Sequence, residues 1–298
     1  MNESYICVIG ASIIDLTGFS KDQLIGKDYN LGKIKISMGG VARNIAENLS
    51  RLNLKVKLIS TIGDDHFGMS MIEHGKKAGI DFTHSLIVEN KATALNIAII
   101  GPDKSLAVGF TDLTIMDELS VEFIKTKKDV IKNASIVILE TNVRESVLQQ
   151  IIKDNPQQKF VLDTAAGPTA KRAKNLLSHL FILKTNEIEA GILFKDNMMN
   201  KKIFTKEPQK HLFITEGEKG VQYFSKELQQ KYLPKTVKAV NTNGAGDAFL
   251  SGVIYGYIKK AKADQWVKMG FTLAENTILQ EETVSQNIDA RLFEHFFE

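Results

Sequence analysis

The chain has 298 residues, of which 43% are hydrophobic and 24% charged, as is ordinary for a globular protein with a sizeable core. Its 38 basic side chains are scattered among 35 acidic ones, so we expect no nucleic-acid partner. No apolar stretch approaches the ~20 residues that span a bilayer and no secretory leader is recognisable, so we expect no membrane partner and a cytoplasmic location.

Short apolar runs rich in β-branched residues recur along the chain, and helical patterns separate them. The runs cover residues 5–10, 55–61, 135–140, 159–164, 179–185 and 211–217. Because they are continuously apolar, they indicate strands that are covered on both faces. We therefore predict one doubly wound α/β domain over residues 1–298, with a mostly parallel sheet between helix layers. The single cysteine, Cys7, lies in the first run, which excludes internal disulfides and predicts an inert buried thiol.

Apolar side chains at helical spacing predict the helices between these strands. In residues 39–53, one stripe should lie against the sheet, and its members are Val41, Ile45, Leu49 and Leu52. Similar patterns cover residues 68–79, 143–154 and 264–279.

One part of the chain departs from this rhythm. Residues 91–110 contain two alternating runs joined by Gly-Pro-Asp-Lys, which is typical of a β-hairpin, and residues 33–37 form another short alternating run. We expect them to form a small two- or three-stranded sheet that projects from the main domain. Its apolar face must be covered by the main domain, by a ligand or by another subunit.

Residues 243–247, Asn-Gly-Ala-Gly-Asp, precede an apolar helical pattern. Glycines let successive amides converge at a helix start, and such a site holds a phosphoryl group well. Asp247 would repel that phosphoryl group unless it removes a proton from an attacking hydroxyl, which suits phosphoryl transfer. The alternative is that Asp247 only caps the helix. The stretch is neither a Rossmann fingerprint nor a Walker loop.

A second pair of glycines, Gly39 and Gly40, precedes a helix with Asn44 in its first turn. Close backbone approach beside a side-chain amide suits a polyhydroxylated ligand, although Gly-Gly is often only a tight turn. Asp15 follows the first strand run and could accept two hydroxyl hydrogen bonds, or could be an ordinary loop aspartate. The histidines never take zinc-ligand spacing, and no Gly-x-Ser-x-Gly elbow is present.

In combination, these stretches resemble the PfkB (ribokinase-like) sugar kinase family. The resemblance rests on the early Gly-Gly with Asn44, on TIGDDHFG at 61–68, KTNEIEA at 184–190, ITEGEKGV at 214–221 and NGAGDAF at 243–249, in family order over nearly the whole chain. It implies a ribokinase-like fold, ATP and Mg²⁺ as cofactors, a small-molecule sugar or nucleoside as substrate, and a β lid built from about residues 16–37 and 91–113. In this family such a lid closes over substrate and often serves in forming a homodimer.

The resemblance also assigns roles residue by residue. Asp247 would be the base, and the anion hole would consist of Gly244, Ala245 and Gly246. The sugar would be held by Asp15, Gly39, Gly40 and Asn44. Asn186 and Glu189 would orient phosphate and magnesium, the glutamate through water. The nucleotide phosphate and ribose would lie along Thr215 and Gly217, and Asn276 would flank the adenine.

Two residues depart from the commonest family form of the last motif. Asn241 stands where that form has Asp, and Asn243 where it has Thr. Many relatives bind a monovalent cation just before the glycines, and a neutral amide binds potassium less strongly than a carboxylate does, so a K⁺ site at Asn241 is doubtful.

The asparagine at 241 and the sequences of residues 111–120 and 281–289 resemble those of the pseudouridine kinase branch of the family. In that branch Glu140, Asn142 and Lys171 would lie near the nucleoside, unless they are surface loop residues. The resemblance thus implies phosphorylation of the primary (5′) hydroxyl of pseudouridine. Ribose, fructose or another nucleoside is the alternative acceptor, and a catalytically silent ligand-binding regulator is the alternative from another class.

Overall fold

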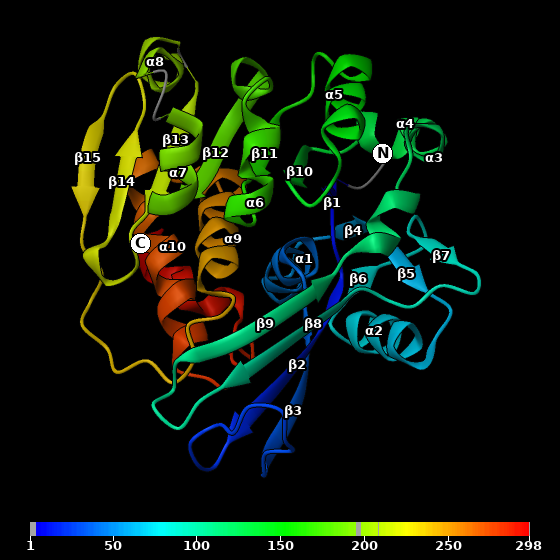
Figure 1. Cartoon of the computed structure of the whole chain (residues 1–298). Helices are drawn as coiled ribbons and strands as arrows, with labels where there is room; N and C mark the ends of the chain where they lie inside the picture. Colours follow the sequence, from blue (N-terminus) through cyan, green and yellow to red (C-terminus); the bar gives the residue numbers. More distant parts are fainter. Residues whose placement is uncertain (1–3, 195–197, 208, 298) are drawn as a thin grey trace.

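The computed structural model describes residues 4–194, 198–207 and 209–297, so the extreme ends of the predicted domain lie outside the described residues. A nine-stranded sheet forms the body, in the order β15-β14-β13-β12-β11-β10-β1-β4-β6 (Figure 1). Every pairing in it is parallel except β13 with β14 and β14 with β15. The predicted doubly wound, mostly parallel sheet is confirmed.

The strands are β1 Ile6–Ile9, β2 Ile13–Ser20, β3 Gly32–Gly39, β4 Val56–Ile59, β5 Thr61–Gly63, β6 Ile80–Asp81, β7 Leu86–Val88, β8 Leu95–Ile100, β9 Leu106–Asp112, β10 Ile136–Glu140, β11 Phe160–Asp163, β12 Leu180–Asn186, β13 His211–Thr215, β14 Val221–Phe224 and β15 Gln229–Tyr232. The α-helices are α1 Val41–Arg51, α2 His66–Lys77, α3 Val121–Lys125, α4 Lys128–Lys132, α5 Glu145–Asp154, α6 Gly167–Ala170, α7 Glu187–Phe194, α8 Met198–Lys206, α9 Ala245–Ile258 and α10 Ala263–Ile278. Short 3₁₀ helices cover Thr114–Glu118, Lys171–Ala173, Leu177–His179, Gly217–Lys219 and Ala290–Phe296.

The central strand β1 shows why its run is continuously apolar. Ile6 and Val8 belong to the hydrophobic cluster under α1, α9 and α10, whereas Cys7 and Ile9 belong to the cluster under α5 and α7. Because successive strand side chains point to opposite faces, a strand between two helix layers needs an apolar residue at every position. Burial raises the pKa of the Cys7 thiol to about 12, which fits the predicted inert thiol.

Two features of the main sheet were not predicted. The apolar run at 55–61 divides into β4 and β5, and these strands join different sheets. The edge strand β15 has the sequence QQKY and no apolar signal, because only one of its neighbours is a strand and its side chains are largely exposed.

The projecting sheet has four strands in the order β3-β2-β8-β9, and Figure 1 shows it extending away from the main body below α1. The hairpin β8–β9 is confirmed, with Gly101 donating its amide to Ser105 across the turn at 2.9 Å. The prediction of two or three strands was wrong, because the chain continues from β1 almost directly into a further strand, β2, which pairs between β3 and β8. Asp15 therefore lies on a strand of this sheet and not in a loop.

The strand register gives this sheet two different faces. Ser37, Asp15, Asn96 and Thr111 lie opposite one another in a row across β3, β2, β8 and β9. The adjacent row, whose side chains point to the other face, consists of Ile36, Leu16, Ile97 and Phe110. We call these the polar and the apolar lid face.

No helix within the described part of the chain is long and apolar enough to cross a membrane.

Candidate active site

The predicted catalytic residue lies where several parallel strands end. β10, β11 and β12 end in or near Glu140, Asp163 and Asn186, and the carboxyl ends of parallel strands share one edge of the sheet. Helix α9 begins over this edge and carries Asp247 in its first turn. The fold thus brings the carboxylates and the start of α9 together.

The start of α9 depends on glycine at two positions. Gly244 is the N-cap residue with φ of 80°, and a Cβ there would lie 2.0 Å from the carbonyl oxygen of Thr283. A Cβ at Gly246 would lie 2.6 Å from Lys184 Nζ, so glycine leaves space for an ammonium group directly against this first turn. The amide of Ala245, between them, points back to Thr242 O at 3.3 Å. The two glycines therefore let the Lys184 ammonium group lie against the first turn of α9, where the helix dipole also favours an anion.

Asp247 is held and electrostatically tuned. Its side chain is 8% exposed, and Asn44 Nδ2 donates to its Oδ2 at 2.8 Å. Burial, and then the charge of Asp163, raise the pKa of Asp247 to about 7, while Lys184 and the Asn44 hydrogen bond act in the opposite direction. A carboxyl group with a pKa near the working pH is suited to general-base catalysis. Among the described residues, the sequence neighbours at this helix start donate no hydrogen bond to the Asp247 carboxylate, whose donor is Asn44, and this weakens the alternative that Asp247 only caps α9.

Two buried charged residues at the site were missed in the sequence. Lys184 Nζ lies 3.0 Å from Asp163 Oδ2, and both side chains are buried at the ends of β12 and β11. Burial lowers the pKa of Lys184, but the carboxylates of Asp163, Asp247 and Glu189 outweigh it and raise the pKa above its usual value. Lys184 is therefore a charged ammonium group within reach of Asp247 and Glu189. The signal was a charged residue closing an otherwise apolar run, in KTNEIEA and in KFVLDT.

The predicted sugar-binding residues lie beside Asp247. Gly40, the N-cap of α1, has φ of 95°, so the turn itself requires glycine. A Cβ at Gly39 would come within 2.1 Å of Asp15 Oδ2, so this glycine is needed for the approach of Asp15. Burial raises the pKa of Asp15, opposed by a hydrogen bond from Asn96 and by the charge of Arg43. Asp15, Asn44 and Asp247 thus present oxygen and nitrogen atoms around the same region, since the charge of Asp15 also acts on Asp247.

The three residues placed near a nucleoside differ from one another. Glu140 is buried and accepts backbone hydrogen bonds from Ala11 at 2.7 Å and from Asn142 at 2.6 Å. Burial raises its pKa to about 7. These bonds make Glu140 a brace between β1 and β10. Lys171 is exposed, and its neighbour Arg172 donates to the carbonyl oxygens of Thr141 and Asn142, each at 2.9 Å. Lys171 is thus a surface residue, and Arg172 is the cation that contacts the backbone at Asn142.

The predicted nucleotide and magnesium residues form a second group. Asn186 Nδ2 donates to Glu189 Oε1 at 2.7 Å, and the Glu189 amide donates to Asn186 Oδ1 at 2.9 Å. Thr164 also donates to the Glu189 carboxylate, so donors of the protein already surround this acid. Such a carboxylate fits Mg²⁺ held through water, because Mg²⁺ sheds its waters reluctantly. Thr215 lies opposite Asn186 in the register of β12 and β13.

The remaining predicted residues, Gly217, Asn241 and Asn276, lie on three other segments. Gly217 has φ of 58° and open space where a Cβ would lie. Asn276 lies on α10, where its amide donates to Thr272 O at 2.8 Å. The Asn241 amide is used internally, since Nδ2 donates to Glu281 O at 2.9 Å and Oδ1 accepts from the Asn243 amide at 3.0 Å. An amide oxygen already engaged in this way is a weak candidate ligand for potassium.

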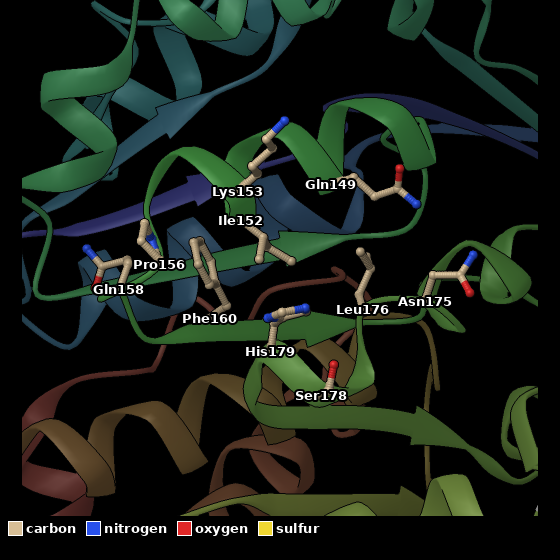
Figure 2. A pocket seen from close by; sticks show the side chains of 10 residues that line it. All are labelled: Gln149, Ile152, Lys153, Pro156, Gln158, Phe160, Asn175, Leu176, Ser178 and His179. Atoms are coloured by element: carbon tan, nitrogen blue, oxygen red, sulfur yellow. The ribbon is translucent and has the colours of Figure 1, made fainter.

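A cavity of about 540 Å³ lies at the opposite edge of the sheet (Figure 2). Phe160 and His179, at the amino ends of β11 and β12, line it, and none of the predicted site residues does. Asn175 Nδ2 donates to Glu145 Oε1 at 2.8 Å, and Gln158 Nε2 donates to the carbonyl oxygens of Ile131 and Ala134. These amides tie neighbouring segments together, so the size of the cavity does not make it the catalytic centre.

The fold and the Asp247 site define an ATP-dependent phosphotransferase that acts on an alcohol group. A family profile described as pfkB family carbohydrate kinase matches residues 3–290, and the chain belongs to this family. The pseudouridine kinase of Escherichia coli K12 is 27% identical, over 84% of this chain and 83% of its own length. The ribokinase of Bacillus subtilis 168 is also 27% identical, over 82% of each chain. The crystal structure of Thermotoga maritima ribokinase aligns with a TM-score of 0.85 over 99% of both chains at 20% identity, which shows the common fold.

Proposed function

We propose that this kinase transfers the γ-phosphoryl group of ATP to the primary (5′) hydroxyl of a ribosyl compound, and that its acceptor is pseudouridine. The observation that carries the proposal is the hydrogen bond of 2.8 Å that fixes Asp247 beside the first turn of α9. A base held next to an anion site can take the proton of a hydroxyl as that hydroxyl attacks a phosphoryl group.

The chain's own residues divide the work as follows. Asp247 accepts the proton from the acceptor hydroxyl, which Asp15 and Asn44 orient through hydrogen bonds. The amides at Gly244, Ala245 and Gly246, together with the Lys184 ammonium, stabilise the negative charge of the transferred group where it develops. Mg²⁺ would supply charge neutralisation of the phosphates, and Asn186 and Glu189 would hold it through water.

The assignment of the nucleotide region is part of the proposal. Thr215 and Gly217 line the phosphates and ribose of ATP, and Asn276 flanks the adenine. The positive φ and open surroundings of Gly217 support close approach of a ligand to the backbone. Because the proposed reaction needs ATP, we propose a cytoplasmic location for the enzyme.

Pseudouridine is favoured over other acceptors by the loops that resemble its kinases and by the relative of that name. The polar lid face supports an acceptor with more polar groups than ribose, because Asn96 and Thr111 extend the polar row beyond Asp15. Ribose remains the second candidate, since a ribokinase has the same sequence identity to this chain.

An acceptor panel tests the proposal. Pseudouridine, uridine, inosine, guanosine, ribose and fructose are each incubated with ATP, Mg²⁺ and enzyme, with and without K⁺, and ADP formation is measured. We expect pseudouridine to be used fastest, with product carrying phosphate at the 5′ position, and little effect of K⁺. If ribose reacts rapidly and pseudouridine does not react, ribose replaces pseudouridine as the proposed acceptor. Calorimetry that shows ligand binding without phosphoryl transfer for every acceptor would support the silent regulator instead.

The apolar lid face supports a homodimer. Phe110 and Leu106 on β9 and Ile34 and Ile36 on β3 are all more than half exposed in the single chain. A second copy of the chain is the proposed cover, because the opposite face of the same sheet is already committed to the site.

A further inference from the structure

Helix α1 contains a charged cluster that the proposed mechanism does not use. Arg43 is 2% exposed, and Glu47, one turn further along, is fully buried. Arg43 Nη2 donates to Glu47 Oε2 and also lies 3.1 Å from His74 Nδ1. The cluster borders a small cavity of about 180 Å³ between α1, β3 and the segment at 282–286. A buried guanidinium is expensive to desolvate and calls for an explanation.

The other nitrogen of the guanidinium reaches the active site. Arg43 Nη1 donates to Asn44 Oδ1 at 3.0 Å and to the carbonyl oxygen of Met38, on β3, also at 3.0 Å. Thr283 Oγ1 adds a contact to each of the same two oxygens, at 3.4 Å to Asn44 Oδ1 and 2.9 Å to Met38 O. The oxygen of the Asn44 amide is therefore surrounded by donors, and its NH₂ group is left to face Asp247.

We propose that Arg43 is a positioning residue of this kinase: it fixes the Asn44 side-chain amide with its NH₂ group toward Asp247 and ties that orientation to the lid strand β3. The inference rests on the proposed function of Asp247. An asparagine side chain that is free to rotate by 180° would present its oxygen to the carboxylate, which repels it. Because Glu47 and His74 hold the second nitrogen of Arg43, the guanidinium itself has little freedom to move.

Removal of Arg43 alone would take one of its two arginine partners, Arg43 and Arg51, from the buried Glu47 carboxylate and could unfold the protein. The test variant is therefore Arg43→Met combined with Glu47→Gln, which removes both charges of the buried pair. The matched control is Arg51→Met. Arg51 Nη2 also donates to Glu47, at 2.7 Å, and to Gln286, and within the described residues it does not bond to Asn44.

Turnover of the acceptor found in the panel is the first measurement. For the double variant we expect kcat/KM for the acceptor to fall roughly 10- to 100-fold, the range of a lost hydrogen bond to a charged group. The KM for ATP should change less than about twofold, because Arg43 lies on the acceptor side. Arg51→Met should match the wild type in both. A purely structural role would instead lower the active fraction and leave KM unchanged.

The second measurement does not depend on turnover. The carboxyl carbon of Asp247 is followed by NMR across pH, with Asp247→Asn used to assign its signal. Asp163, Lys184, Asp15 and Glu140 also face this carboxyl group, and none of them is changed in the variants. Loss of the fixed Asn44 donor should raise the pKa of Asp247 by roughly one unit in the double variant, and not in Arg51→Met.

The two ideas fail separately. A double variant that is folded and has the same acceptor kcat/KM and the same Asp247 titration as Arg51→Met overturns the role of Arg43. If Asp247→Asn keeps full turnover, the proposed function of Asp247 fails, whereas the NMR titration still decides whether Arg43 positions Asn44.

Discussion

Replacement of Asp247 by Asn should separate activity from stability. The variant keeps the size of the side chain and an oxygen that can accept the Asn44 hydrogen bond, but it cannot take a proton. We expect kcat to fall about 10²- to 10⁴-fold, the usual contribution of a general base, with nearly unchanged KM for ATP.

The same substitution should stabilise the fold above neutral pH. The pKa of Asp247 is raised from 3.8 to about 7 by burial and by Asp163. The folded state thus retains a proton that the unfolded chain has already released, so this residue lowers stability progressively as pH rises from about 4 to about 7, and no further above that. At ~1.4 kcal/mol per pKa unit, the unfavourable contribution at pH 8 is at most about 4 kcal/mol.

Asparagine does not titrate, so the stability gained by Asp247→Asn should grow between pH 5 and pH 8. If half of the upper limit is realised, the gain is about 2 kcal/mol, which raises Tm by roughly 3 °C for a chain of this size. Thermal unfolding of both proteins at pH 5, 6, 7 and 8 measures it. A Tm difference that is the same at every pH would show that the carboxyl group is not buried as described, and undiminished kcat would remove it from the mechanism.

Three further substitutions test the geometry around this residue. Gly244→Ala places a Cβ 2.0 Å from Thr283 O at φ of 80°, so chemical denaturation should show a free energy of unfolding lower by at least about 2 kcal/mol. The control Gly217→Ala, where φ is 58° and space is open, should lose about 1 kcal/mol. Equal losses would contradict the close approach at Gly244. Lys184→Met leaves Asp163 buried without its cation, and we expect a loss of about 3–5 kcal/mol with a higher KM for ATP. Lys219→Met, which removes an exposed charge 3.8 Å from Glu187, is its control, and if the two variants behave alike, Lys184 has no special place at the site. Phe110→Ser on the apolar lid face should shift sedimentation from dimer to monomer without lowering Tm, whereas Thr111→Ser on the polar face should not; unchanged sedimentation of Phe110→Ser would rule out this face as the dimer interface.

The main sheet was predictable because burial on both faces leaves a plain signal in the sequence. In β1 and β10 the side chains are buried, so the runs stay apolar except for Glu140 at the end of β10. The edge strand β15 carries no such signal, since its side chains are mostly exposed.

The site was predictable only in part. The turn glycines and Asp247 stand out because their spacing has few other uses. Lys184 and Asp163 did not stand out, because a charged residue at the end of a strand run reads as the first residue of a loop until the fold covers it.

Helix α1 shows the same limit more clearly. Its apolar stripe was recognised, and a helix with one apolar stripe is expected to expose its other side to water. The structure buries that other side too, including Arg43, Asn44, Glu47 and Asn48. Nothing local to the helix indicates this, because the covering elements come from positions as distant as Thr283 and Asp247.

The alternation of the lid strands separates two kinds of evolutionary change. Asp15 and Asn96 share one surface, while their immediate neighbours Leu16 and Ile97 share the reverse. Under the proposed function, substitutions at every second codon would alter which alcohol is accepted and leave the proposed self-association surface intact. Insertion or deletion of one residue within such a strand would exchange the two surfaces at once. The lid should accordingly tolerate many point changes among relatives but few changes in strand length.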